Sequence, residues 1–232
     1  MTAARDLLLA WAERRINTQG VEIAVRTGGS GPPLLLHGYP QTHACWHKIA
    51  AKLARHCTLV LADLRGCGAS SVPADTPEHR SFAKQTMALD CLAVMGSLGH
   101  ARFMVGGHDR GGRVAYRLAL DHSEAIMASQ PIDILPTAEV WRRVSAESAL
   151  ASYHWGFLAQ PAPTPERLIS ADPQFYLEHT LKSWAKSAEP LQVWGAWCGD
   201  LSGAEIDSGH FLAEENPRAT LAAVLPFIGV RR

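Results

Sequence analysis

Residues 103–120 read FMVGGHDRGGRVAYRLAL, and this stretch decides the fold. Residues 103–105 are apolar and predict a short buried strand, and residues 111–120 carry apolar side chains at helical spacing. Between them, residues 107–111 have the form G-x-nucleophile-x-G of a sharp strand-to-helix turn. A side chain at either glycine would clash with the neighbouring helix or strand. We therefore predict that Asp109 stands at the N-terminus of a helix, where the helix dipole favours an anion.

The same strand-then-helix alternation recurs along the chain. Apolar residues 33–36 run into HGYPQT, and residues 58–62 run into DLRGCGAS. Helices are expected at residues 46–53 and 82–98, in addition to 111–120. Apolar strands alternating with helices predict an α/β fold with a mostly parallel, doubly wound sheet covered on both faces. In such sheets the functional groups gather in loops after the carboxyl ends of the strands.

The N-terminal part gives weaker signals. Residues 4–16 have a helical pattern, and residues 21–26 alternate as an edge strand would. Residues 28–33 are rich in Gly and Pro and predict a turn. We therefore expect a helix, an edge strand and a turn before the first buried strand.

The pattern changes after Pro136, where tryptophans and tyrosines occur in a broken helical stretch. This composition is typical of a lid over a sheet rather than of further sheet. We predict three segments: residues 1–136 form the first part of the core, residues 137–187 a shortened helical lid, and residues 188–232 the rest of the core. The last segment contains a predicted helix at residues 217–227.

Composition bounds the function. The chain has 232 residues, 47% of them hydrophobic, and 22 basic residues balance 22 acidic ones. This zero net charge gives no reason to expect a nucleic-acid or membrane partner. The N-terminus lacks the apolar run of a secretory signal, so a cytoplasmic protein is expected. The five cysteines are irregularly spaced and odd in number, which predicts free thiols.

No metal or cofactor is expected from the sequence. His43 and His47 are four residues apart and could share a helix face, but no HExxH motif or cysteine cluster accompanies them. Neither a GxGxxG nor a P-loop motif is present.

An aspartate at the centre of the turn points to a particular chemistry. A carboxylate with an ordinary pKa of about 3.9 is ionised at neutral pH and needs no base to activate it. It can attack an sp³ carbon that bears a leaving group, and water must then cleave the resulting ester. His210, in IDSGHF, is the candidate base for that water. The alternative interpretation is a GxDxG turn in which Asp109 only caps a helix.

Longer motifs connect the chain to a known family. It closely resembles the fluoroacetate (haloacetate) dehalogenases of the α/β-hydrolase superfamily, over residues 21–184 and again over residues 191–227. The motifs that carry the resemblance are HGYPQTHACW, ADLRGCGASSVP, GGHDRGGRVAYRLALDH, DILPTAEVW, YHWGFLAQPAP, DPQFYLEHTLKSW and SGHFLAEENP. The resemblance implies an α/β-hydrolase fold with a helical lid, and hydrolysis of the carbon–halogen bond of a small 2-haloacid such as fluoroacetate or chloroacetate.

The resemblance also implies roles for the reacting residues. Asp109 is the expected nucleophile, His210 the base, and Asp133 the acid that orients His210. Arg110 and Arg113 match the arginines that grip the substrate carboxylate. The spacing agrees, since Arg113 lies one helical turn after Asp109, and a bidentate arginine would hold the carbon for in-line attack.

Further roles concern the halide and the pocket. His154 and Trp155 match the family's halide-binding pair, whose N–H groups would meet the departing ion. Trp184 matches a tryptophan at the pocket entrance, although simple packing explains it equally well. Tyr39 follows HG, and its backbone N–H would help to form the oxyanion hole. Besides the haloacid and water, no partner is implied; a homodimer is compatible with the sequence, which does not decide the oligomeric state.

The chain departs from the family between Trp184 and His210. Family members carry several dozen more residues there, including the lid tyrosine that serves as third halide ligand and a strand of the sheet. We therefore expect a central parallel strand to be absent unless residues 190–194, PLQVW, replace it. Pro131 also fits poorly in a central strand, because it cannot donate a ladder hydrogen bond.

Two other functions stay open at this stage. An epoxide hydrolase shares the aspartate nucleophile, but it activates the epoxide with lid tyrosines, whereas this chain offers two arginines and a His-Trp pair. The second alternative is a non-catalytic, shortened homologue that binds a carboxylate or another partner without turnover. The short segment at residues 185–209 is its main support.

Overall fold

The computed structural model describes residue 8 and residues 11–29, 33–74, 79–182, 193–194 and 196–229. The chain divides into two compact units. The first combines residues 1–134 with residues 202–232, and the second comprises residues 135–201.

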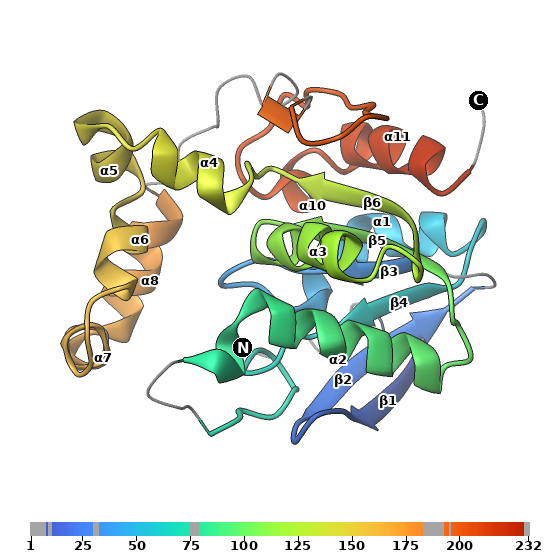
Figure 1. Ribbon diagram of the computed structural model, residues 1–232, viewed down its shortest axis with the longest axis horizontal. Coiled ribbons are helices and arrows are strands. Elements are labelled where there is room, and N and C mark those ends of the chain that lie inside the picture. The colour runs from blue at the N-terminus through green and yellow to red at the C-terminus, as the bar shows by residue number, and fades with distance from the viewer. Residues whose placement is uncertain are drawn as a thin grey trace. The chain divides into compact units, whose positions relative to one another are not determined.

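A six-stranded sheet forms the centre of the first unit, with strand order β1-β2-β4-β3-β5-β6 (Figure 1). The strands are β1 (Ala12–Asn17), β2 (Glu22–Gly28), β3 (Pro33–Leu36), β4 (Leu59–Ala62), β5 (Phe103–His108) and β6 (Ile126–Ile132). The four strands β3 to β6 pair in parallel, and β1 and β2 join antiparallel at one side. The predicted mostly parallel α/β sheet is therefore confirmed.

Helices cover both faces of this sheet. The longest are α2 (Lys84–Ser97), α3 (Arg110–Asp121) and α11 (Pro217–Phe227); the shorter ones are α1 (His47–Leu53), α10 (Leu212–Glu215) and the 3₁₀ turns η2 (His43–Trp46) and η3 (Arg80–Phe82). Helices α2 and α3 pack on one face, and α1 and α11 pack on the other (Figure 1).

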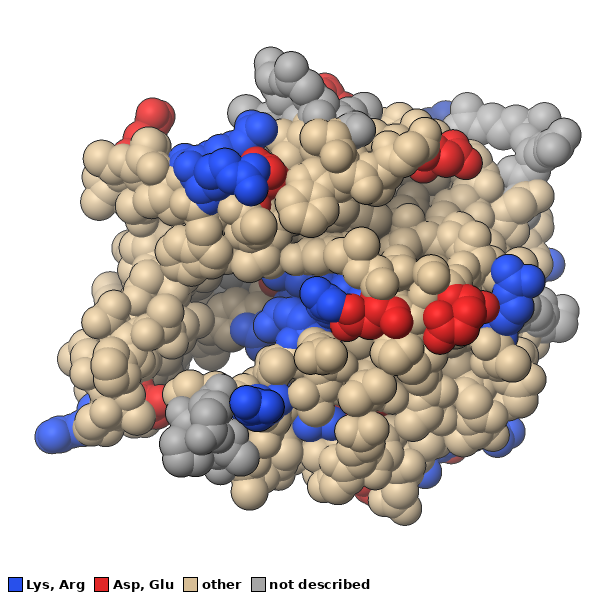
Figure 2. Space-filling view, in the orientation of Figure 1, with Lys and Arg blue, Asp and Glu red and all other residues tan. Residues whose placement is uncertain are grey.

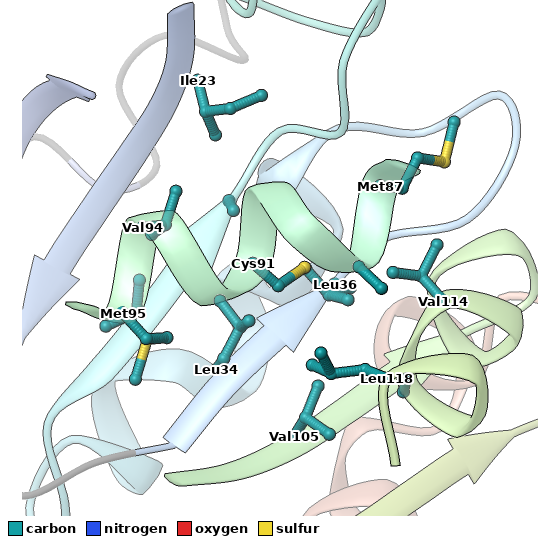
Figure 3. Packing of buried hydrophobic residues seen from close by; sticks show 14 of the residues in the cluster. Ile23, Leu34, Leu36, Met87, Cys91, Val94, Met95, Val105, Val114 and Leu118 are labelled. Carbon is teal, nitrogen blue, oxygen red and sulfur yellow. The ribbon is translucent and has the colours of Figure 1, made fainter. Parts of the chain in front are cut away.

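Alternation along β3 explains why its sequence is continuously apolar. Leu34 and Leu36 lie in the cluster beneath α2 and α3, together with Val105 of β5 (Figure 3). Leu35 lies in the opposite cluster, against α1 and α11. Successive side chains of a strand point to opposite faces, so a strand covered on both faces needs apolar residues at every position.

The helix predicted for residues 4–16 is wrong for residues 12–16. They form β1, which pairs antiparallel with β2 from Ala12 opposite Thr27 to Asn17 opposite Glu22. The open edge of β2 offers a row of unpaired backbone groups, and pairing with it outweighs a weak helical preference. Residues 4–7 and 9–10 lie outside the described part of the chain.

Two related expectations also change. The strand predicted at residues 21–26 exists as β2, but it lies between β1 and β4 and is not an edge strand. Within the predicted turn at residues 28–33, Gly29 adopts a left-handed φ of 88°. Gly28 and Pro33 belong to strands, and residues 30–32 lie outside the described part.

Strand β6 is an edge strand among the residues that the structure describes. It pairs with β5 alone. The Ile132 carbonyl faces β5, where it accepts from Asp109 N, so the nitrogen of Pro131 faces the open edge and removes no bond of the ladder. The expected poor fit of Pro131 in a central strand therefore does not arise here. Of the segment 190–194, Val193 and Trp194 are helical rather than extended, and residues 190–192 lie outside the described part.

In the second unit the described regular elements are all helices. Its helices are α4 (Thr137–Arg142), α5 (Ala146–Ala151), α6 (Tyr153–Leu158), α7 (Thr164–Ala171) and α8 (Pro173–Lys182). Aromatic rings join α6 to α8, with 5.7 Å between the centroids of Phe157 and Tyr176, and the Tyr153 hydroxyl lies 3.0 Å from Thr180 Oγ1. That residues 137–187 act as a lid stays a prediction.

Charged side chains of both signs lie on the face of the molecule drawn in Figure 2. On the face drawn in Figure 2, basic and acidic residues occur in small groups separated by uncharged surface, in agreement with the balanced composition. None of the described helices is both long and apolar enough to span a bilayer.

Candidate active site

The predicted turn is present between β5 and α3, with Asp109 at its tip. Asp109 has φ 45° and ψ −113°, a backbone conformation that an L residue rarely adopts. Its N–H donates to the Ile132 carbonyl at 3.1 Å, and its carbonyl accepts from Arg113 N at 3.0 Å. The strained residue is therefore fixed on one side to β6 and on the other to the first turn of α3.

The two glycines of the turn are required by close packing. A Cβ at Gly107 would lie 2.3 Å from the backbone of Gly111. A Cβ at Gly111 would lie 2.5 Å from the Leu36 carbonyl oxygen of β3. These contacts confirm the clash expected from the G-x-D-x-G pattern.

The Asp109 carboxylate accepts a hydrogen bond from Tyr39 N, with 2.9 Å between nitrogen and Oδ2. Burial alone would raise the pKa of Asp109. Opposing it are the electrostatic influence of His108, the Tyr39 N–H, and the charges of His210 and Arg113, so the net pKa lies below its ordinary value. The carboxylate is therefore ionised at neutral pH, as a nucleophile must be.

Asp133 and His210 meet although 77 positions separate them in the sequence. Asp133 follows β6 with a φ of 52°, and its Oδ2 lies 2.6 Å from His210 Nδ1. A carboxylate can only accept, so Nδ1 carries the proton and Nε2 of His210 keeps a lone pair. The pair thus has the arrangement of an oriented general base, and His210 is close enough to Asp109 to lower its pKa.

The neighbours of His210 are held by Glu215, which sequence reasoning missed. Gly209 N donates to Glu215 Oε2 at 2.6 Å, and Phe211 N donates to Oε1 at 3.1 Å. One carboxylate therefore grips the backbone on both sides of the histidine. Its position in EEN, two residues after SGHF, was the available signal, but a glutamate there is also ordinary for a short helix.

His108 is a second histidine at the site that the sequence did not single out. It is 4% exposed, and its ring centroid lies 4.5 Å from that of His210. Its Nδ1 lies 3.1 Å from Gln41 Oε1, and Gln41 Nε2 donates to Glu214 Oε2 at 2.9 Å. Burial, followed by the charge of His210, lowers the pKa of His108 to about 4, so the ring is neutral at neutral pH.

Arg110 and Arg113 lie on the first turn of α3, directly after Asp109. The Arg110 guanidinium lies 5.0 Å from the centroid of the Tyr39 ring, a cation–π contact. Arg113 is buried; burial lowers its pKa, while the Asp109 charge opposes that shift. The structure thus brings a buried guanidinium near the candidate nucleophile, as the spacing in the sequence predicts.

Lys84 adds a third cation that the sequence did not reveal. It is the first residue of α2, and its pKa is lowered to about 8, chiefly by burial and then by the charges of Arg110 and Arg113. Asp109 acts on it in the opposite direction. Lys84, Arg110 and Arg113 therefore interact electrostatically with one another, and Lys84 and Arg113 also with Asp109. This excess of positive charge favours an anionic ligand.

The remaining predicted residues belong to the second unit or fall outside the description. His154 and Trp155 are adjacent on α6, where Trp155 packs edge-on against Trp141 with 5.5 Å between centroids. Trp184 lies outside the described residues.

The histidine pair considered for a metal is engaged elsewhere. His43 Nδ1 lies 2.9 Å from Asp63 Oδ1, and His47 Nδ1 lies 3.0 Å from the Ala44 carbonyl oxygen.

The fold, the strand-to-helix turn and the Asp–His pair define a hydrolase class. The family model described as alpha/beta hydrolase fold matches residues 32–204. The chain therefore belongs to the α/β-hydrolase family, which confirms the fold class predicted from the sequence.

Relatives narrow the resemblance. The chain is 40% identical over 214 residues to a fluoroacetate dehalogenase from Burkholderia sp, covering 84% of this chain and 70% of that protein. It is 34% identical to a soluble epoxide hydrolase from Corynebacterium sp. (strain C12), covering 67% of this chain and about half, 53%, of that protein. A solved structure of a putative alpha/beta hydrolase from Nostoc sp PCC 7120 is 35% identical, with a TM-score of 0.91 over 95% of this chain and 99% of that one. The resemblance to the fluoroacetate dehalogenases is confirmed.

Proposed function

We propose that the protein hydrolyses the carbon–halogen bond of a small 2-haloacid such as fluoroacetate or chloroacetate. One observation carries this proposal: an ionised carboxylate, Asp109, stands at a strained turn among basic side chains, near a histidine oriented by Asp133. The Burkholderia relative, whose name states fluoroacetate dehalogenation, supports the choice of substrate.

In the first step the substrate carboxylate binds Arg113 and Arg110, which orient the halogen-bearing carbon toward Asp109. A carboxylate oxygen of Asp109 attacks that carbon, the carbon–halogen bond breaks with its electron pair leaving on the halide, and an ester forms. No base is needed for this step, because the Tyr39 N–H and the neighbouring His108, His210 and Arg113 outweigh the effect of burial and keep Asp109 ionised. His154 and Trp155 are the proposed donors to the departing halide, on the basis of the family resemblance alone.

In the second step water cleaves the ester. His210 Nε2 takes a proton from water, and the water oxygen attacks the Asp109 carbonyl carbon. The Tyr39 N–H, already 2.9 Å from an Asp109 carboxylate oxygen, would stabilise the negative charge of the tetrahedral intermediate. The ester bond then breaks and the 2-hydroxyacid leaves with the proton from His210. The resulting carboxylic acid of Asp109 releases the remaining proton of the water to solvent, which regenerates the carboxylate.

Trapping the ester tests this scheme. His210→Asn should block the second step only, so incubation with chloroacetate should increase the intact mass by the added carboxymethyl group. Asp109→Asn should show no such adduct. An active wild type combined with an unmodified His210→Asn protein would contradict the two-step reaction.

Epoxide hydrolysis is the second candidate, favoured by the similarity to the soluble epoxide hydrolase. An epoxide is uncharged and would gain no ionic interaction with Lys84, Arg110 or Arg113. We therefore rank epoxide hydrolysis below haloacid hydrolysis. Parallel assays of halide release from fluoroacetate and chloroacetate and of diol formation from styrene oxide separate the two.

Binding without turnover is the third candidate, because the chain spans 70% of its dehalogenase relative. Thermal unfolding with and without haloacetate, measured beside halide release, tests it. A gain in stability with haloacetate but no halide release would support this candidate.

A further inference from the structure

Three side chains at the site form a metal-type donor set. His108 ends β5, Asp133 follows β6, and His210 precedes α10; one ligand atom from each lies within 4.8 Å of the other two. Two imidazoles and one carboxylate are a common ligand set of zinc sites in which the fourth position is open to water. This trio differs from the His43 and His47 pair, whose Nδ1 atoms already have protein partners.

The tautomer of His108 leaves a lone pair without a partner. Gln41 donates its amide to Glu214, so its oxygen faces His108 Nδ1 and requires a proton there. His108 Nε2 is then an acceptor, and in the described part of the chain no hydrogen bond reaches it. The His210 backbone is close enough to oppose the lowering of the His108 pKa, but it makes no hydrogen bond of ordinary geometry with Nε2.

A buried imidazole nitrogen without a partner is unfavourable, and the residue is 4% exposed. His108 Nε2 therefore holds a lone pair that can coordinate a metal beside the Asp133–His210 pair, and this lone pair makes no hydrogen bond. A cation bound there would supply the missing partner.

We propose that His108 Nε2, His210 Nδ1 and one carboxylate oxygen of Asp133 capture a divalent cation of the zinc class, and that the captured cation holds the site inactive. Neutral His210 would move its proton from Nδ1 to Nε2 as the metal binds, so the ring coordinates without any net loss of a proton. A ring protonated at Nε2 has no lone pair there to accept a proton from water. The cation therefore disables the base and leaves Asp109 unaltered.

The local structure allows the small movement that coordination needs. Tetrahedral bonds of about 2.0 Å place ligand atoms about 3.3 Å apart, whereas His210 Nδ1 and Asp133 Oδ2 are 2.6 Å apart. Residues 201–206 before His210 form neither helix nor strand and are largely exposed. Other ligand atoms of the trio lie up to 4.8 Å apart and must approach one another. Because His108 is fixed in β5, the movement, of up to about 1.5 Å, falls mainly on His210 and its loop.

Zinc titration of the whole protein tests the site without relying on catalysis. Isothermal titration of the wild type with Zn²⁺ should give one site per chain. His108→Gln should weaken that site by at least tenfold, and His56→Gln should leave it unchanged, because His56 is exposed and outside the trio. Mg²⁺, which prefers oxygen ligands, should not compete.

A second variant and a second metal ion keep the test valid if His108→Gln does not fold. If thermal unfolding shows that His108→Gln is unfolded, His210→Asn decides, because it alters an edge residue of the site and should weaken zinc binding equally. Co²⁺ bound to the wild type should give visible d–d absorption that the same variants lose. Equal zinc affinity in the wild type and a folded variant, or no binding by the wild type, would overturn the proposal.

Activity provides the separate test of inactivation. Saturating Zn²⁺ should abolish halide release, and the metal chelator EDTA should restore it. A protein that binds zinc but never releases halide would refute the proposed function and leave the metal site standing. Full activity at zinc saturation would refute the inactivation.

Discussion

The turn that carries Asp109 and the loop that carries His210 are held in opposite ways. Asp109 is fixed by backbone hydrogen bonds to Ile132 and Arg113 and by glycine contacts too close to admit a Cβ. His210 is positioned by side chains: Asp133 holds its ring, and Glu215 holds the backbone of its neighbours. The candidate nucleophile is therefore positioned by the backbone of the fold, whereas the candidate base depends on two carboxylate side chains, Asp133 and Glu215.

The largest expected effect on activity comes from Asp109, in the turn that the backbone holds. Asp109→Asn keeps the size of the side chain and tolerates the positive φ, but it removes the nucleophile. Halide release should fall by about 10⁴-fold or more, with little change in thermal stability. Activity within tenfold of the wild type would exclude Asp109 from the reaction.

The next effect concerns the carboxylate grip on α3. Arg113→Ala should lower kcat/KM by about 100-fold, because a buried hydrogen bond to a charged group contributes about 3 kcal/mol, and it should raise KM while lowering kcat. Arg117→Ala is the matched control on the same helix, since Arg117 pairs with Asp121. Steady-state kinetics that show equal losses in both variants would remove Arg113 from the site.

A smaller effect on activity is expected in the loop that carries His210. Glu215→Gln presents an amide N–H₂ to a backbone N–H, so one of the two bonds beside His210 is lost. We expect kcat to fall by about tenfold with KM unchanged, and the Gly209 and Phe211 amides to exchange hydrogen faster. Glu205→Gln, at an exposed position in the same segment, should match the wild type. If the two variants behave alike, Glu215 does not position the base.

The smallest expected effect is on stability, and it tests the basic side chains near Asp109. The pKa of Lys84 is about 8 in the folded protein, below its ordinary value of 10.5. Its charge therefore opposes folding below pH 8, and this penalty fades as pH rises from about 8 to 10.5, where only the unfolded chain keeps the proton. Lys84 is partly exposed, so Lys84→Met should stabilise the protein at pH 7 by about 1 kcal/mol after allowing for solvent screening.

Urea unfolding of Lys84→Met at pH 7 and pH 10 measures this difference. The advantage over the wild type should narrow at the higher pH. Lys52→Met, at an exposed position, should show neither the gain nor its pH dependence. A constant advantage at both pH values would mean that packing, and not charge, is responsible.

Local patterns predicted most of the first unit. The apolar run at residues 103–105, the glycines at 107 and 111, and the helix after them are enough to predict the turn from its own residues. Helices α1, α2 and α3 also appear close to their predicted positions, because their apolar spacing reports a buried face. The position of β1 was missed because its strand conformation depends on pairing with β2, and its own residues are mostly exposed.

The residues around His210 were harder to predict. Gln41, His108, Glu214 and Glu215 act through hydrogen bonds to groups elsewhere in the site, and a polar side chain in a sequence does not reveal its partner. Lys84 was missed for the same reason: its altered pKa arises from burial and from two arginines more than twenty positions away. The position of Asp133 was predicted from the family resemblance alone.

The sequence by itself determined the buried strands β3, β4 and β5, the sharp turn at Asp109 and the arginines that follow it, because these depend on periodicity, on glycine and on neighbours within one helical turn. Only the tertiary structure decided that Asp133 meets His210, that His108 lies against His210, and that residues 12–17 extend the sheet as β1. Those outcomes depend on contacts with other segments of the chain, where geometry rather than local preference selects the partner.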